Sequence, residues 1–285
     1  MRFAIAGTDR YLGVARAFCE AGWTPIKLFA SDVDGRLDKN KAIVEWAQAA
    51  KLSVQLSRVQ KEDLRQLQDE GCEALVVASY AWRIPEWRDN LRYAVNFHPS
   101  PLPEARGPDP TVRAILEERT SWAITCHKID QEFDTGEILS AESFELASDD
   151  DGEVLDLKLQ MAGARLAKRV AADFTALWRG ARAQGPGSYW PRWTRNEREL
   201  NFGEPVERLL RQVKAFGEIG CFAQVNKVGL FVKRASGWVE AHDYPPGTMV
   251  HEHDLRFVVA AQDGYIVINE WTLFEGGSKT ARLAP

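Results

Sequence analysis

The first hundred residues alternate between short apolar segments and longer amphipathic ones, and this alternation constrains the fold more than any other feature. In the amphipathic segments apolar residues recur every three or four positions, as they do in helices that pack on a sheet. The predicted helices cover residues 11–21, 41–50 and 61–70, and the predicted strands cover residues 2–6, 25–30, 53–56, 74–78 and 92–98. Strands joined by helices run parallel to one another. The sequence therefore predicts an α/β fold with a doubly wound, mostly parallel, Rossmann-like sheet.

The rest of the chain divides at a stretch rich in glycine and proline, which we predict to be a linker over residues 181–200. The predicted elements before it are a helix at 111–118, strands at 122–129 and 138–146, and a long helix at 151–178 with a continuous apolar stripe. We therefore expect a large domain over residues 1–180 and a small domain over residues 201–285.

The predicted small domain begins with a helix and continues in short apolar runs that glycines separate. The helix covers residues 205–216, and the runs cover residues 223–225, 229–233, 255–260 and 265–271. Short strands at such spacing are typical of small barrels. We expect a small C-terminal β-barrel of the OB-like kind.

Polar side chains gather where predicted strands end. Asn96 and His98 close the strand at 92–98, and residues i and i+2 of a strand point to the same face. A later loop carries Asp134. In a doubly wound sheet, ligands bind outside the carboxyl ends of the strands, which is also where the segment 80–85 is expected. The sequence thus predicts a reaction site that combines an amide, an imidazole and a carboxylate.

These three groups suit one kind of chemistry. An amide N–H can donate to a developing oxyanion, and a histidine can transfer protons. We expect the carboxylate of Asp134 to raise the pKa of His98, because it favours the imidazolium. No nucleophilic serine or cysteine belongs to the cluster. The residues therefore suit direct attack of an amine on a carbonyl carbon through a tetrahedral intermediate.

Each of these residues also has a plainer interpretation. Asn96 could be a turn residue, His98 could be a core histidine, and Asp134 could belong to an Asx turn before Thr135. His98, His127 and Asp134 could instead hold a metal ion, but no HExxH or CxxC spacing supports this. We expect His127 to lie in a strand, and we expect no metal.

Two further motifs give weaker signals. The histidines at 251 and 253 flank Glu252 with His242 nearby, and we interpret this candidate metal cluster as a solvated loop. The turn after the first predicted strand lacks GxGxxG, so dinucleotide binding is not supported.

The central stretch resembles a known family. Its motifs, in chain order, are Asn96-Phe97-His98-Pro99-Ser100, Leu102-Pro103, Arg106-Gly107, Pro110 and Asp134-Thr135-Gly136. This succession of N-x-H, LPxxRG and DTG is similar to that of the folate-dependent formyltransferases. The resemblance covers residues 1–180 well. Residues 201–285 resemble, more weakly, the C-terminal barrel of the tRNA-acting members of that family.

The resemblance implies a role for each matching residue. Asn96 would hold the formyl oxygen, His98 would transfer protons and stabilise the oxyanion, and Asp134 would orient and charge His98. The co-substrate would be N10-formyltetrahydrofolate. Its pterin would lie between two loops and contact Tyr80, Trp82, Arg83 and Ile84 from one loop and Ile129, Asp130, Gln131 and Phe133 from the other. The acceptor side would be lined by Ser100, Pro101, Leu102 and Arg106.

Charge bears on the choice of acceptor. The chain has a formal net charge of −5, and residues 201–285 hold nine Lys and Arg against ten Asp and Glu. The loop at 31–40 also leans acidic. A tRNA-binding protein should neutralise several phosphates with clustered cations. We therefore expect formyl transfer to the primary amine of a small acceptor, such as a nucleotide-linked amino sugar or an amino-acid-like precursor. A methionyl-tRNA formyltransferase is the alternative.

Two other classes stay open. A formyltetrahydrofolate hydrolase would need the same site without an acceptor, and a folate-binding module could use the same fold without catalysis. A homodimer is also left open.

The composition is that of an ordinary globular protein, with 45% hydrophobic and 27% charged residues. No apolar run approaches the ~20 residues that cross a bilayer, and the first ten residues do not resemble a signal peptide. The four cysteines are scattered without a CxxC pair, which indicates reduced thiols. We therefore expect a cytoplasmic protein with no membrane partner.

Overall fold

The structure is a computed structural model that describes residues 1–31 and 39–274. Most of the acidic loop at 31–40, including Asp32, Asp34, Arg36 and Asp38, lies outside the described residues. The chain forms two compact units, each of which combines separate segments. The first unit is Met1–Pro110, Thr120–Ala147 and Leu155–Arg192, and the second is Thr111–Arg119, Ser148–Val154 and Trp193–Pro285.

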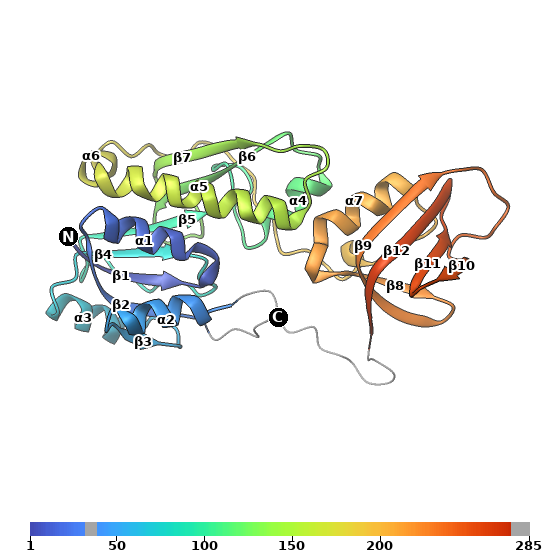
Figure 1. Ribbon diagram of the computed structural model, residues 1–285. Coiled ribbons are helices and arrows are strands. Elements are labelled where there is room, and N and C mark those ends of the chain that lie inside the picture. Colours follow the sequence, from blue (N-terminus) through green and yellow to red (C-terminus); the bar gives the residue numbers. More distant parts are fainter. Residues whose placement is uncertain (32–38, 275–285) are drawn as a thin grey trace. The chain divides into compact units, whose positions relative to one another are not determined.

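A seven-stranded sheet organises the first unit (Figure 1). Across the sheet the strands are β3 (Ser53–Gln55), β2 (Thr24–Ala30), β1 (Arg2–Gly7), β4 (Ala74–Ala78), β5 (Tyr93–His98), β6 (Ser121–Lys128) and β7 (Ile138–Glu145). The five neighbouring strands β3, β2, β1, β4 and β5 are parallel to one another, whereas the pairs β5–β6 and β6–β7 are antiparallel. The predicted mostly parallel sheet is therefore confirmed. Its switch point lies between β1 and β4, where successive connections leave in opposite directions.

Helices cover both faces of this sheet. The helices that the described residues form are α1 (Leu12–Glu20), α2 (Lys41–Ala49), α3 (Lys61–Asp69), α4 (Pro110–Leu116), α5 (Gly152–Ala172), α6 (Phe174–Arg179) and α7 (Val206–Phe216), with 3-10 turns at Asp9–Tyr11, Asn196–Arg198 and Gly217–Ile219. On one face Leu64 of α3 shares a buried cluster with Ala4 of β1. On the other face the ring of Phe18 in α1 lies 5.7 Å from that of Phe3, the neighbour of Ala4. Coverage of both faces explains why β4 is apolar along its whole length.

The predicted long helix at 151–178 is interrupted. Asp173 leaves the helical conformation, with φ −112° and ψ 25°, so α5 ends and α6 begins there. Phe174, the next residue, packs between Trp23 and Tyr93, with ring centroids 4.9 and 5.1 Å away. The apolar stripe is continuous in the sequence, but aspartate is a poor helix former and burial of Phe174 favours the break.

An antiparallel five-stranded sheet organises the second unit. Its strands, in order across the sheet, are β10 (Met249–His253), β11 (Arg256–Ala260), β12 (Gly264–Leu273), β9 (Val228–Val239) and β8 (Cys221–Val225). Leu209 and Val213 of α7 share one buried cluster with Val232 and Ile266 of this sheet. The sequence predicted a small OB-like β-barrel here. The structure confirms a separate β-rich fold, in the form of an antiparallel five-stranded sheet with β10 and β8 at its edges.

The prediction of a loop at residues 251–253 is wrong. These residues belong to β10, where His251 and Glu252 pair with Val258 and Phe257. The three side chains are exposed, because β10 is an edge strand. These three consecutive residues are all polar, so the sequence shows no apolar alternation from which a strand could be predicted.

Among the described residues, no helix is long and apolar enough to span a membrane. All four cysteines are free.

Candidate active site

The end of β5 places two polar side chains beside one carboxylate oxygen. Asn96 Nδ2 lies 3.4 Å from Asp134 Oδ1, and His98 Nδ1 also lies 3.4 Å from that atom. His98 is 4% exposed. Its other ring nitrogen, Nε2, lies 3.1 Å from the carbonyl oxygen of Ala105. The structure therefore brings together the amide, the imidazole and the carboxylate, which are up to 38 residues apart in the chain.

Asp134 is fixed by its own loop. Its backbone has φ 59°, a left-handed conformation that aspartate tolerates better than most residues. The N–H of Gly107 donates to Asp134 Oδ2 at 3.0 Å. A Cβ atom on Gly136 would lie 1.9 Å from the carbonyl oxygen of Lys128, so only glycine fits there. The DTG motif is thus required by backbone packing as well as by the carboxylate.

His127 also belongs to this cluster, although it was not among the three predicted catalytic residues, and it lies in a strand as predicted. It lies in β6 directly opposite Asn96 of β5. Its Nε2 is 3.2 Å from Asn96 Nδ2 and 3.6 Å from Asp134 Oδ1, and its Nδ1 is 2.7 Å from the carbonyl oxygen of Lys128. Because that carbonyl requires a proton on Nδ1, a neutral His127 accepts at Nε2 from the amide of Asn96. The antiparallel β5–β6 register, which the sequence does not reveal, creates this contact.

Burial dominates the pKa of His98. It lowers this pKa below 6.5, although the charge of Asp134 and the carbonyl of Ala105 act in the opposite direction. Asp134 raises the pKa of His98 as predicted, but burial outweighs it and the net shift is downward. The carboxylate has the predicted sign, but the sequence could not show that the imidazole is almost fully buried.

Asp134 stays ionised in this environment. Burial alone would raise its pKa. In acid, where both histidines are protonated, a hydrogen bond from His127, the charges of the two histidines and the Gly107 N–H lower it to about 2. At neutral pH the site therefore combines the neutral imidazole of His98 with the carboxylate of Asp134.

Gln184 joins the two loops that carry these groups. Its Nε2 donates to the carbonyl oxygens of Asp134 and Gly136, at 2.8 and 2.7 Å. Its Oε1 accepts from Arg106 at 3.0 and 2.8 Å. Gln184 belongs to the predicted linker, where nothing in the pattern indicated a role at the site. Neighbouring residues of this segment also pair with the first unit, through bridges Ile138–Arg182 and Arg106–Tyr189.

The predicted acceptor residues differ in their exposure. Ser100 is fully buried, and its Oγ donates to the carbonyl oxygen of Glu104 at 2.8 Å. Leu102 is 8% exposed. Pro101 and Arg106 are partly exposed, and Arg106 is held by Gln184. Ser100 and Leu102 therefore shape this loop from inside, whereas Pro101 and Arg106 present surface.

The predicted pterin loops approach each other at one pair of residues. Arg83 donates to the carbonyl oxygen of Gln131, and its guanidinium lies 5.9 Å from the ring centroid of Phe133, which is 54% exposed. Asp130 forms an ion pair with Arg88 at 2.8 Å.

The other predicted pterin contacts are tied to the protein. Tyr80 accepts a hydrogen bond from the backbone N–H of Val59 at 3.0 Å and packs edge-on against Trp82, with centroids 5.4 Å apart. Burial raises the pKa of Tyr80 to about 12. Ile84 and Ile129 pack partly buried against the core. Contact with Tyr80 thus supports Trp82 in the loop that follows β4.

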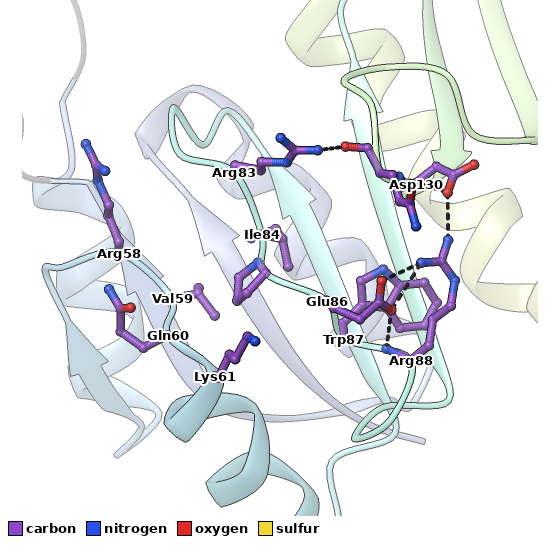
Figure 2. A pocket seen from close by; sticks show the side chains of 12 residues that line it. Arg58, Val59, Gln60, Lys61, Arg83, Ile84, Glu86, Trp87, Arg88 and Asp130 are labelled. Carbon is purple, nitrogen blue, oxygen red and sulfur yellow. Dashed lines mark hydrogen bonds and ion pairs between the residues drawn. The ribbon is translucent and has the colours of Figure 1, made fainter.

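A cavity of about 520 Å³ lies against both loops (Figure 2). Four of the eight predicted pterin residues line it: Arg83, Ile84, Asp130 and Gln131. A second cavity, of about 490 Å³, shares Trp87, Arg88 and Asp130 with the first and reaches Gly136, two residues beyond Asp134. Neither cavity is lined by Asn96, His98 or Asp134. Within residues 1–31 and 39–274, no group of three or more His, Cys, Asp or Glu could hold a metal ion.

Comparison with known sequences gives two family matches. Residues 30–170 match the family described as Formyl transferase, and residues 192–281 match Formyl transferase, C-terminal domain. The methionyl-tRNA formyltransferase of Methylibium petroleiphilum is 31% identical over 92% of this chain and 89% of its own length. That of Thiobacillus denitrificans is 27% identical over 95% of this chain and 91% of its own length.

Solved structures show the same fold. An N-formyltransferase from Helicobacter canadensis, in complex with folinic acid and dTDP-3-aminofucose, has a TM-score of 0.68 at 18% identity, over 95% of this chain and 99% of that chain. HypX from Aquifex aeolicus, in complex with tetrahydrofolic acid, has a TM-score of 0.67 at 16% identity, over 95% of this chain and 44% of that chain.

Proposed function

Because the chain belongs to the formyl transferase family, we propose that it transfers the formyl group of N10-formyltetrahydrofolate to the primary amine of a small acceptor. One observation carries this proposal. Asn96 and His98 converge at 3.4 Å on the same oxygen of Asp134, and that carboxylate has a pKa of about 2. An amide donor, a neutral imidazole and a fixed negative charge are the groups that acyl transfer to an amine requires.

The reaction needs one bond to form and one to break. The amine nitrogen attacks the formyl carbon, and the formyl oxygen becomes an oxyanion that the Asn96 amide stabilises by donation. Collapse of the tetrahedral intermediate breaks the bond between the formyl carbon and N10. The formylated amine and tetrahydrofolate leave. The proton lost by the amine balances the proton that N10 gains.

His98 is placed to move that proton. Its Nε2, 3.1 Å from the carbonyl oxygen of Ala105, carries the ring proton in the neutral form. Its Nδ1 is then free to accept a proton from the attacking amine. The resulting imidazolium lies 3.4 Å from Asp134, which stabilises it until the proton passes to the leaving nitrogen. Asp134 therefore acts by charge and by orientation.

The charge of the second unit supports a small acceptor. Six of its basic side chains already form ion pairs with carboxylates: Arg113, Arg119, Arg208, Arg211, Lys233 and Arg234. Arg198 is buried. Proteins that bind tRNA neutralise phosphates with clustered cations that are free to do so. The described part of this unit offers few of them, so an amino sugar or an amino-acid-like amine fits better.

A methionyl-tRNA formyltransferase is the second candidate, favoured by the names of relatives that align over almost the whole chain. An assay of tetrahydrofolate release tests both proposals. The protein is incubated with N10-formyltetrahydrofolate alone, with nucleotide-linked amino sugars, with amino-acid-like amines, and with charged initiator tRNA. Release that depends on a small amine supports the first proposal, and release that depends on tRNA replaces it with the second. Release without any amine indicates a hydrolase, and binding without release indicates a folate-binding module.

A further inference from the structure

Four aromatic rings lie together on the second unit, where β9 ends and β12 begins. They belong to Trp238, His242, Tyr244 and Tyr265, which we call the aromatic patch. The ring of Tyr265 contacts those of Trp238 and His242, with centroids 5.2 and 4.7 Å away. The ring of Tyr244 is 6.0 Å from that of His242. Trp238 and Tyr244 are 44% and 52% exposed, and contiguous exposed rings of this kind are typical of interaction sites.

The patch belongs to the face of the sheet that α7 does not cover. Trp238 of β9 pairs directly with Tyr265 of β12, so their side chains share one face. Ile266, the next residue of β12, points to the opposite face and shares a buried cluster with Leu209 of α7. The rings of Trp238 and Tyr265 are therefore directed away from α7, on the side of the sheet where Trp238 is open to solvent.

Hydrogen bonds fix the rings before any ligand binds. The backbone N–H of Tyr244 donates to Nδ1 of His242 at 3.2 Å. Nε2 of His242 therefore carries the ring proton and donates to the carbonyl oxygen of Gly264 at 3.0 Å. The indole N–H of Trp238 donates to the carboxylate of Glu240 at 2.6 Å. Rings held in this way lose little conformational freedom on binding, which favours affinity.

The charge around the patch is negative. Residues 235–269 contain five Asp and Glu but only one Lys or Arg, which is Arg256. Glu240 lies beside the ring of Trp238, and the exposed Asp243 belongs to the loop that carries two of the rings. Binding of a nucleic acid requires clustered cations for its phosphates, whereas a cation is attracted both to carboxylates and to aromatic faces. The charge therefore favours a cationic ligand.

The angles between the rings suit a planar cation. Neighbouring rings of the patch are tilted by 40°, 38° and 45°, so they form a curved platform. A methylated ammonium is bound by rings that enclose it, whereas a guanidinium is planar and stacks on a single aromatic face. Arg195 makes such a contact elsewhere in this unit, 5.6 Å from the ring centroid of Phe222. Among the described residues no Lys or Arg lies over a ring of the patch, so these faces are free for arginines of another polypeptide.

We propose that the aromatic patch binds a partner polypeptide through its arginine side chains. Each guanidinium stacks on an exposed ring, and Glu240 and Asp243 supply the opposite charge. Tryptophan, tyrosine and arginine are the residues that contribute most to binding at protein interfaces. No residue of the candidate active site takes part, so this interaction goes beyond the proposed function and is tested separately from it.

The test measures binding of two labelled peptides to the full chain by fluorescence anisotropy. One peptide has four Gly-Arg repeats and the other has four Gly-Lys repeats, so their charges are equal but only the first has planar cations. The wild-type protein should bind the arginine peptide at least about threefold more tightly than the lysine peptide. Trp238→Ala/Tyr244→Ala should weaken binding of the arginine peptide about fivefold or more, the scale of two exposed cation–π contacts.

Two further variants separate the rings from apolar surface in general. Trp238→Leu/Tyr244→Leu keeps apolar side chains without aromatic faces and should weaken binding of the arginine peptide as the alanine variant does. Leu255→Ala is the control, because it removes a 73% exposed apolar side chain from the turn between β10 and β11. This variant should bind the arginine peptide as the wild-type protein does. Circular dichroism verifies the fold of each variant.

Each other result has a definite meaning. Failure of the wild-type protein to bind the arginine peptide overturns the inference, and so does equal affinity for the two peptides, which would indicate attraction by charge alone. A leucine variant with wild-type affinity would show that the aromatic faces are not used. If an oligouridylate of eight nucleotides binds the wild-type protein more tightly than the arginine peptide and Trp238→Ala/Tyr244→Ala abolishes that binding, the patch stacks nucleobases, and the inference is wrong.

Discussion

The side-chain amide of Gln184 donates to the main-chain carbonyl of Asp134 at 2.8 Å, so a residue 50 positions away holds the loop that carries the Asp134 carboxylate. The same side chain also binds Gly136 and Arg106. One amide thus joins the loop that follows β5 to the loop that follows β6. Asp134 itself has a left-handed backbone, which its surroundings must maintain.

Gln184→Ala should therefore lower kcat. Loss of four hydrogen bonds frees the loop of Asp134, and a displacement of about 1 Å at a catalytic group costs up to about 100-fold in rate. We expect a loss of at least tenfold, measured as formyl transfer at saturating folate and amine. Gln184→Glu should not restore activity, because a carboxylate cannot donate to the two carbonyl groups.

A matched control is Gln224→Ala, which removes an exposed glutamine from β8 in the second unit. It should leave kcat unchanged. A Gln184→Ala protein that turns over at the wild-type rate would show that the loop of Asp134 does not need this bridge.

The pH dependence of the rate should report His98. Burial lowers the pKa of this residue below 6.5, and the proposed mechanism needs its neutral form as the proton acceptor. The rate constant kcat/KM should therefore stay level above pH 6.5 and fall at lower pH, as the imidazole of His98 becomes protonated. Asp134 raises the pKa of His98, so Asp134→Asn should move this decline to still lower pH as well as reduce the rate.

The position of the decline is measured from pH–rate profiles of the two proteins and from the NMR titration of His98. A decline that Asp134→Asn moves to higher pH would contradict the assigned direction. His98→Ala provides the baseline: it should abolish turnover while tetrahydrofolate still binds. Full turnover in that variant would remove His98 from the mechanism.

Strand periodicity was enough to predict the sheet and the placement of Asn96 and His98. Both follow from local pattern, because a run such as Ala74–Ala78 identifies a doubly covered strand and alternation within β5 fixes which side chains share a face. The strand at Met249–His253 carried no apolar pattern, so its pairing with β11 could not be anticipated.

The contacts that His127 and Gln184 make at the site could not be predicted for a different reason. His127 reaches Asn96 only through the antiparallel register of β5 and β6, and Gln184 reaches Asp134 only through the path of residues 182–190. Both depend on tertiary contacts between distant segments. The downward effect of burial on the pKa of His98 could not be predicted either, since burial of a side chain is a property of the folded chain.

The carboxyl group of Asp134 should make stability depend on pH. Its pKa is about 2 in the folded protein against 3.8 for an ordinary aspartate, so the folded state favours the ionised form. The stabilisation is therefore complete above pH 4 and is lost as the pH falls toward 2. By linkage it amounts to about 2 kcal/mol. Urea unfolding from pH 6 to pH 2.5 measures it.

Asp134→Asn is the comparison for this measurement. Its free energy of unfolding should fall less steeply than that of the wild-type protein between pH 4 and pH 2.5, because the amide does not titrate. Parallel curves for the two proteins over this range would show that the carboxyl group contributes no pH-dependent stability.

The glycine of the DTG motif should be required for folding of the loop. A Cβ on Gly136 would lie 1.9 Å from the carbonyl oxygen of Lys128, whereas a Cβ on Gly185 meets nothing within 4 Å. Gly136→Ala should thus destabilise the protein by about 1–3 kcal/mol, the range for overpacking, and lower kcat because Asp134 shifts. Gly185→Ala should leave the free energy of unfolding within about 1 kcal/mol of the wild-type value. Thermal unfolding and the formyl-transfer assay compare the pair. Equal stability and equal kcat in the two variants would mean that the loop has room the structure does not show.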